Sequence, residues 1–235
     1  MDALQLTGRK ADHVVEVAEP ACQLHGAAVE PFLALCQAAA RAGHPLAVVS
    51  SFRDFGRQRQ IWNAKYRGER PVMDRRGRPL EVTALDPRRR VEALLRWSAL
   101  PGASRHHWGT DLDVADRNVL ASGYCPRLDP AEYRRGGPFA ALGDWLGQHV
   151  HRYGFYRPYT RSGTGVAAEP WHLSFAPVAR GALAGMTLDL LAGAIENAGV
   201  EGESEILARL PAIRRRYVLA VTPPPRMRSR WARLS

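Results

Sequence analysis

Apolar positions recur at helical spacing early in the chain and then give way to a short apolar run. Over residues 27–42 the apolar side chains lie three and four positions apart, which predicts an amphipathic helix. Gly43 follows as a stop signal. Residues 45–50 have the length and valine content of a buried strand. The pattern therefore predicts a helix that leads directly into a core strand.

The same pattern predicts further helices and strands. We expect helices over residues 58–66, 91–100 and 138–153. Residues 104–115 are expected to pass from a loop into a strand, and residues 169–175 to form another strand. No internal repeat is visible along the chain.

Two regions interrupt or extend this core. Residues 66–90 are polar and rich in arginine and proline, and we expect a long loop with a small hairpin around Val72 and Leu80. Because long ordered loops in compact domains are often functional, this loop is a candidate wall of a cleft. Beyond residue 176 the pattern predicts elements over residues 183–198, 205–210 and 213–221, followed by a basic tail from residue 223.

Composition supports one domain with a sizeable core. The chain has 235 residues, of which 46% are hydrophobic, and this excludes wholesale disorder. No apolar run reaches the ~18 residues that span a bilayer, and the N-terminus lacks the apolar core of a secretory signal. We therefore expect a cytoplasmic protein without a membrane span, unless another route releases it to the cell wall. The three cysteines have no C-x-x-C spacing, which argues against a disulfide framework or a thiolate metal site.

The chain is strongly basic, with a formal net charge of +10. Lys10 and Lys65 are the only lysines, so the remaining 31 of the 33 basic residues are arginines. They cluster in expected loops and in the tail, without helix-turn-helix or zinc-finger spacing. We therefore expect no specific nucleic-acid partner and interpret the arginines as solvated surface. Attraction to anionic cell-wall polymers or precursors is the functional alternative.

Two short motifs carry the candidate chemistry. The first, S-x-H-x-x-G-x-x-x-D, spans residues 104–113, and the second, E-P-W-H, spans residues 169–172. They offer His106, Asp113 and His172 as metal ligands and leave the Glu169 carboxylate free. A hydrolytic zinc site needs three protein ligands, an open position for water and a base beside that water. Because the set contains no thiol, it favours a catalytic zinc over a closed structural one.

This pair of motifs resembles the signature of VanY-type D-alanyl-D-alanine carboxypeptidases, which belong to the wider LAS group of zinc peptidases. The resemblance implies that His106, Asp113 and His172 bind Zn²⁺ and that Glu169 is the catalytic base. The sequence departs from the family at Asp111, where a small residue, usually alanine, is frequent. This leaves open which of Asp111 and Asp113 binds the metal.

A third segment extends the resemblance upstream. Residues 50–58 resemble the family's S-x-Y-R-S-x-x-x-Q segment, with two substitutions. The resemblance implies that Arg53 stabilises the oxyanion and that Gln58 and Ser104 contact the substrate. The structural alternative for Arg53 is to cap a helix or to pair with Asp54.

Strand geometry adds three predictions around the motifs. Alternation places Asp113 on the cleft face of its strand. Glu169 lies three positions before His172, an odd offset that puts the two on opposite faces of a regular strand. Pro170 prevents regular pairing there, so a bend is needed to bring Glu169 over the metal. His107, the neighbour of a predicted ligand, is expected to face away from the metal.

The resemblance implies an α+β fold in which a central antiparallel sheet carries the zinc ligands and helices pack on it. It covers residues 25–176, with an N-terminal segment (1–24) before it and a helical C-terminal extension with a basic tail (177–235) after it. The expected function is that of a zinc-dependent peptidase acting on peptidoglycan peptides or precursors, as a carboxypeptidase that removes C-terminal D-alanine. The alternatives are an endopeptidase that cuts the stem peptide or cross-bridge, and a zinc-stabilised binding module without catalysis. The sequence leaves D,D- or L,D-specificity, oligomeric state and the role of the extension open.

Overall fold

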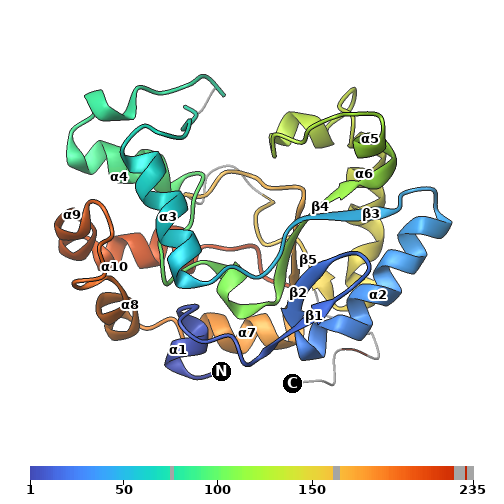
Figure 1. The fold of residues 1–235 in the computed structure, drawn as a ribbon, viewed down its shortest axis with the longest axis horizontal. Helices are drawn as coiled ribbons and strands as arrows, with labels where there is room; N and C mark the ends of the chain where they lie inside the picture. The colour runs from blue at the N-terminus through green and yellow to red at the C-terminus, as the bar shows by residue number, and fades with distance from the viewer. Residues whose placement is uncertain (75–76, 161–164, 225–230, 232–235) are drawn as a thin grey trace.

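A four-stranded antiparallel sheet lies at the centre of the computed structural model, which describes residues 1–74, 77–160, 165–224 and 231 (Figure 1). Its strands follow the order β3-β4-β6-β5. They comprise β3 (Leu46–Ser50), β4 (Asp111–Asp116), β6 (His172–Phe175) and the short β5 (Phe155–Tyr156). Helices pack on this sheet, so the predicted α+β fold with a central antiparallel sheet is confirmed.

The two middle strands separate an apolar face from a polar one. Leu112 and Val114 of β4 are fully buried in the same core as Leu173 and Phe175 of β6. Helices α2 (Gly26–Arg41) and α6 (Ala140–His149) contribute to this core. Because side chains alternate along a strand, the intervening polar residues point the other way. They are Asp111, Asp113, His172 and Ser174.

A second hydrophobic core joins helices that are far apart in the sequence. Helices α3 (Phe55–Tyr66) and α4 (Pro87–Leu95) share it with four helices from the C-terminal part of the chain (Figure 1). These four are α7 (Ala176–Ala184), α8 (Leu188–Ile195), α9 (Glu203–Ala208) and α10 (Leu210–Ile213). Trp62 of α3 is fully buried there, and its Nε1 donates to the Glu201 carbonyl at 2.9 Å. The residues expected to form a C-terminal extension thus share one hydrophobic core with α3 and α4.

The prediction of one helix over residues 183–198 is wrong. α7 ends at Ala184, and α8 continues at an angle of 83° to it. Thr187 fixes the start of α8, because its side chain accepts a hydrogen bond from the Leu190 backbone N–H. Among the described residues no single helix is long and apolar enough to cross a membrane, and α7 with α8 meets that test only as a bent pair, by length and composition.

Helix caps and short helices explain other shifted bounds. α4 begins at Pro87, earlier than predicted, because the Asp86 side chain accepts from the Arg89 N–H. Residues 138–153 divide into α6 and a 3₁₀ helix, η4 (Val150–Tyr153). The remaining short elements are α5 (Arg117–Ala121), the 3₁₀ helices η1 (Val82–Ala84), η2 (Arg105–Trp108) and η3 (Pro130–Tyr133), and the π-helical η5 (Arg214–Val218).

The N-terminal segment packs beside the residues of the first motif. It forms α1 (Ala3–Leu6) and an antiparallel hairpin of β1 (Val14–Val17) and β2 (Cys22–His25). Trp108 Nε1 donates to the Leu6 carbonyl at 3.2 Å, and the His25 N–H donates to the Gly109 carbonyl at 2.8 Å. Gly109 has a φ of +64°, and an added Cβ would lie 2.7 Å from the His25 nitrogen. Both the backbone conformation and this close approach therefore require glycine.

The loop between α3 and α4 contains the small hairpin that the sequence predicts. Met73 and Pro79 form an isolated antiparallel bridge, and the Leu80 N–H donates to the Val72 carbonyl at 2.8 Å. Residues 75–76 of this loop lie outside the described residues, as does most of the predicted basic tail.

Candidate metal centre and catalytic site

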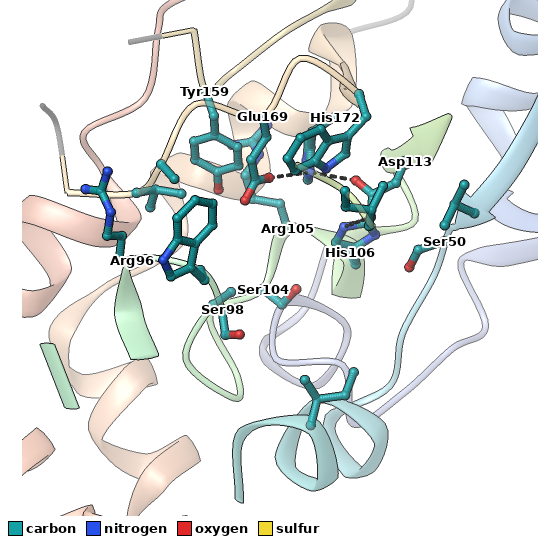
Figure 2. Close-up of a pocket in the computed structure, with 18 of the residues that line it drawn as sticks. Ser50, Arg96, Ser98, Ser104, Arg105, His106, Asp113, Tyr159, Glu169 and His172 are labelled. Atoms are coloured by element: carbon teal, nitrogen blue, oxygen red, sulfur yellow. Dashed lines mark ion pairs between the residues drawn. The ribbon is translucent and has the colours of Figure 1, made fainter. Parts of the chain in front are cut away.

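The three predicted metal ligands come together on the polar face of the sheet (Figure 2). One ligand atom from each of His106, Asp113 and His172 lies within 4.8 Å of the others, and all three side chains are buried. His106 lies on η2, just before β4. Asp113 and His172 are directly opposite each other in the register of β4 and β6. Because opposed residues on one face lie ~5 Å apart, the sheet itself brings these two side chains together.

The His106 ring is fixed so that only one nitrogen is free for a metal. Its Nδ1 donates to the Ser51 carbonyl at 2.7 Å, and its Nε2 faces Asp113 Oδ2 at 3.5 Å. Burial, together with the nearby Arg53 guanidinium, lowers the pKa of His106 to about 3. The ring is therefore neutral near pH 7, as a metal-binding imidazole must be.

His172 is held among three carboxylates. Its Nε2 donates to Asp111 Oδ1 at 2.9 Å, while its Nδ1 lies 3.1 Å from Asp113 Oδ1 and 3.2 Å from Glu169 Oε2. Burial disfavours the charged ring, but the hydrogen bond to Asp111 and the close contacts of Nδ1 with Asp113 and Glu169 outweigh burial and raise the pKa of His172 well above its usual value. The centre therefore attracts positive charge, and a divalent cation competes with a proton for it.

Asp111 lies behind His172 and not at the ligand cluster. Besides the His172 bond, its carboxylate accepts from Arg105 Nε at 2.8 Å, from Thr110 Oγ1 at 2.5 Å and from Ser174 Oγ at 3.0 Å. Burial opposes the charge, but Arg105 and these hydrogen bonds outweigh it and hold the pKa of Asp111 well below its usual range. Asp111 thus orients the His172 ring, and Asp113 is the aspartate that joins the ligand cluster.

The ligand cluster fits Zn²⁺. Asp113 Oδ1 is buried and has no hydrogen-bond partner among the described residues, although His172 Nδ1 is 3.1 Å away. The two atoms are close without the alignment of a hydrogen bond, as expected of ligand atoms that converge on a shared cation. Two imidazole nitrogens and one carboxylate oxygen form a ligand set typical of catalytic zinc sites.

Glu169 reaches His172 through a turn. The His172 N–H donates to the Glu169 carbonyl at 3.1 Å, with Pro170 between them, so Glu169 precedes β6 and is not part of it. The Glu169 N–H also donates to the Tyr159 carbonyl at 2.9 Å, which fixes the turn from the other side. Because of this bend, Glu169 is not on the opposite face from His172, as it would be on a regular strand. Its carboxylate lies beside the ligand cluster (Figure 2).

Arg53 lines the cavity beside the cluster, and Gln58 holds it in place. Arg53 Nη1 donates to Gln58 Oε1 at 2.9 Å, and Gln58 Nε2 donates to the Ala99 carbonyl at 2.7 Å. Burial lowers the pKa of Arg53, whereas the charges of Asp113 and Glu169 act in the opposite direction. Gln58 is buried and does not line the cavity, so the structure does not place it where the predicted substrate contact requires.

His107 faces away from the ligand cluster, as expected. Its Nδ1 donates to the Arg53 carbonyl at 2.6 Å, and its Nε2 accepts from the Gly102 N–H at 3.1 Å. Burial lowers the pKa of His107 to about 4, which keeps this ring, hydrogen-bonded at both nitrogens, neutral. His107 therefore supports the backbone of Arg53.

A cavity of about 1240 Å³ opens over these groups. Ser104 lines it, and its Oγ is buried without a hydrogen-bond partner among the described residues, so this hydroxyl is available to a bound molecule. Sequence reasoning missed Tyr159, whose ring meets His172 edge-on at 5.1 Å and whose pKa burial raises to about 12. It also missed Lys65 in the cavity wall. Neither residue belongs to a motif, so their spacing carried no signal.

Comparison with known proteins agrees with this geometry. The family model for VanY, described as D-alanyl-D-alanine carboxypeptidase, matches residues 21–178. An uncharacterized protein of Haemophilus influenzae is 45% identical over 98 residues, which are 40% of this chain and 67% of that protein. A second protein of the same organism is 32% identical over 122 residues, which are 51% of this chain and 93% of that protein.

Two solved structures share the fold. VanYB in complex with D-alanine-D-alanine has a TM-score of 0.51 at 18% identity, covering 83% of this chain and 82% of its own. A mutant of the vancomycin-resistance D,D-pentapeptidase VanY in complex with Zn(II) has a TM-score of 0.50 at 18% identity. The match covers 85% of this chain and 87% of that protein's chain. At this identity the likeness shows a common fold and no more.

The family match, the fold and the site together define the class of this protein as a peptidase. Because the family match extends over more than half of its length, the chain belongs to the VanY D-alanyl-D-alanine carboxypeptidase family.

Proposed function

We propose that this protein is a zinc-dependent carboxypeptidase that removes C-terminal D-alanine from peptidoglycan-type peptides. One observation carries the proposal: the Glu169 carboxylate lies 3.2 Å from Nδ1 of His172, the same nitrogen that faces Asp113. A free carboxylate beside a three-residue zinc ligand set is the arrangement that hydrolysis of a peptide bond requires.

In this proposal His106, Asp113 and His172 hold the metal. When bound, Zn²⁺ supplies Lewis-acid chemistry that polarises a carbonyl group and makes water more acidic. Glu169 accepts a proton from the attacking water as the water oxygen bonds to the scissile carbonyl carbon. Glu169 then gives this proton to the amine nitrogen as the carbon–nitrogen bond breaks. The reaction yields a shortened peptide acid and a free amino acid.

Arg53 supports the charge that develops on the carbonyl oxygen. Its guanidinium lines the cavity near Asp113 and Glu169, and Gln58 fixes its orientation through Nη1. A cation fixed in advance in a largely buried site stabilises an oxyanion more strongly than water does, because no reorganisation is needed.

The choice of substrate rests on the family and on its solved structures. The family is named for D-alanyl-D-alanine carboxypeptidase, and the VanYB structure contains D-alanine-D-alanine. The Zn(II) in the related VanY structure supports the choice of metal. The large cavity has room for a peptide that extends beyond the scissile dipeptide.

The decisive experiment is D-alanine release from a muramyl-pentapeptide by zinc-loaded protein, with Glu169→Ala measured beside it. We expect release by the wild type and a rate at least about 100-fold lower in the variant, with bound zinc unchanged. No release by the wild type with bound zinc confirmed would refute the carboxypeptidase. Mass spectra of digested sacculi would then show whether an internal bond is cut, which would identify an endopeptidase, or no bond at all, which would favour a binding module.

A further inference from the structure

Positive charge gathers on one wall of the cavity, away from the candidate metal ligands. Lys65 enters this wall from the last turn of α3, Arg70 from the loop after it and Arg96 from the residue after α4. Figure 2 shows Arg96 and Ser98 on the side of the cavity away from Asp113. Within the part of the chain that the structure describes, no carboxylate lies within 4.0 Å of these three cations. The wall therefore holds positive charge that is not paired directly with a carboxylate of the described residues.

Lys65 and Arg96 are partly buried, whereas Arg70 is exposed. Lys65 Nζ donates to Ser98 Oγ at 2.6 Å, a neutral partner. Burial lowers the pKa of Lys65 to about 8, and the charges of Arg70 and Arg53 lower it too, whereas Glu169 acts in the opposite direction. Because an ammonium has three donors, two remain for a ligand after the Ser98 bond. Lys10, the only other lysine, is half exposed and lies 2.6 Å from Asp12.

The position of Lys65 is tied to the candidate oxyanion group. Gln58, which holds Arg53, and Lys65 are seven residues apart on α3, about two helical turns, and so lie on nearly the same side. The adjacent residues Ser98 and Ala99 accept hydrogen bonds from Lys65 and Gln58 respectively. One helix and one loop thus fix the two cations Arg53 and Lys65 in the same cavity.

Arg96 adds to this electropositive wall. Its Nε is buried and has no hydrogen-bond partner among the described residues, and its guanidinium lies 5.5 Å from the Trp97 ring centre. By contrast, two of the three acidic residues that line the cavity, Asp113 and Glu169, belong to the candidate catalytic centre. The wall around Lys65 thus favours an anionic group on the bound molecule.

We propose that Lys65 recognises a carboxylate of the peptide substrate and is a specificity-determining residue of this enzyme. The ammonium donates to the carboxylate oxygens, Ser98 fixes its position, and Arg70 and Arg96 supply the surrounding positive charge. This inference rests on the proposed function for the identity of the substrate. The carboxylate has two sources, the C-terminal residue that is released or an acidic residue within the peptide, and the two are distinguished by experiment.

The first test measures binding without turnover. Lysine labelled with ¹³C at Cε gives two resonances, from Lys10 and Lys65, in zinc-loaded Glu169→Ala protein. We expect a peptide ending in D-alanyl-D-alanine to shift the Lys65 resonance and to leave Lys10 unchanged. Amidation of the terminal carboxylate, or of an internal one, abolishes the shift if that group is the one recognised. Equal shifts with the free acid and with both amides would overturn the proposal.

The second test is kinetic and uses Lys65→Met, which keeps the length of the side chain and removes its charge. We expect KM for the free-acid peptide to rise about 10- to 100-fold, as for the loss of a hydrogen bond to a charged group. The penalty is absent for the amidated peptide that lacks the recognised carboxylate. Lys10→Met is the matched control and keeps wild-type kinetics. Ser98→Ala shifts KM in the same direction by a smaller factor.

The outcomes separate this inference from the proposed function. Wild-type hydrolysis with the same KM for Lys65→Met as for wild type would refute the role of Lys65 and leave the carboxypeptidase intact. If the wild type cleaves no peptide, the proposed function fails, and the resonance of Lys65 still decides whether it binds a carboxylate.

Discussion

His172 Nε2 donates a hydrogen bond to Asp111 Oδ1 at 2.9 Å, and this bond distinguishes the two aspartates that lie two positions apart on β4. It turns the opposite nitrogen of the ring toward Asp113 and Glu169. A carboxylate behind a metal-binding histidine fixes the tautomer of the ring and makes it a better ligand. Asp111 also neutralises the buried Arg105, so one carboxylate serves both the site and the core.

Replacement of Asp111 by Asn is expected to weaken zinc binding about 10- to 100-fold, because the ring loses its charged acceptor. The free energy of unfolding also falls, because Arg105 is left buried without its charge partner. Competition with a fluorescent zinc chelator measures the affinity, and circular dichroism confirms that the variant is folded. Asp116→Asn, at the other end of the same strand, is the control and keeps wild-type affinity. Equal affinity in the Asp111 variant would show that this bond does not support the metal.

Arg53 and Gln58 are expected to act as one unit in catalysis. Arg53→Lys lowers kcat about 10²- to 10³-fold, the range for loss of a single oxyanion donor. Gln58→Leu lowers kcat about 10-fold with little change in KM, because it frees the guanidinium without touching the substrate. In the double variant Gln58→Leu adds nothing further, since the group that it positions is already gone.

A double-mutant cycle on kcat measures this coupling. Gln60→Leu, on the exposed side of the same helix, is the matched control and leaves kcat unchanged. Strict additivity of the Arg53 and Gln58 effects would assign Gln58 a direct contact with the substrate, as the family resemblance suggests.

Gly8→Ala is expected to disturb the site from outside it. Gly8 has a φ of +72°, and an added Cβ would lie 2.3 Å from Nδ1 of His107, the atom that supports the Arg53 carbonyl. Because both the backbone and the ring must shift, we expect a loss of about 1–3 kcal/mol in the free energy of unfolding and a lower kcat.

Denaturant titration and steady-state kinetics check the Gly8 prediction. Gly26→Ala is the control, because nothing lies within 4 Å of its added Cβ at the start of α2. A Gly8 variant as stable and active as wild type would mean that the N-terminal segment does not support the site.

The residues that come together at the candidate metal centre were largely identifiable from sequence, because they stand in two short motifs with fixed spacing. His106 and Asp113 share one short motif, and the fold brings His172 to them by the register of β4 and β6. Apolar alternation placed Asp113 on the cleft face of its strand, whereas the central antiparallel sheet followed from the family resemblance. The role of Asp111 did not follow from the sequence, because alternation puts both aspartates on one face, and only the orientation of the His172 ring separates them.

Other features depend on long-range packing and left no local signal. The bend at Glu169 requires a backbone hydrogen bond to His172, and Pro170 indicates only that regular pairing stops. The Gln58 side chain accepts from Arg53 because its amide is fixed by the Ala99 carbonyl, which lies 41 residues later in the sequence. The break between α7 and α8 was missed because apolar residues continue on both sides of Gly185 and Thr187. Lys65 gave no signal because a lysine near the end of a helix is ordinarily exposed.

Lys65→Met is expected to stabilise the protein while it impairs substrate binding. The pKa of Lys65 is about 8 in the folded protein, below the ordinary lysine value of 10.5. A lysine with a lowered folded pKa destabilises the folded state fully below that pKa, and the penalty disappears as the pH rises toward the unfolded value. The difference in pKa corresponds to at most ~3 kcal/mol. We therefore expect the variant to exceed wild type by about 1–3 kcal/mol at pH 7.

The pH dependence identifies the cause of this gain. The difference in the free energy of unfolding between Lys65→Met and wild type should be constant below pH 8 and shrink as the pH rises to 10.5. It shrinks because in this window the unfolded wild-type chain binds a proton that the folded protein does not. Urea titrations of both proteins at pH 7, 9 and 10.5 measure it, and Lys10→Met should show no gain at any pH. A gain that does not change with pH would reflect improved packing by methionine. A loss of stability would show that the Ser98 bond outweighs the cost of the buried charge. The predicted result, greater stability with a higher KM, would mean that the fold keeps an uncompensated cation for its substrate.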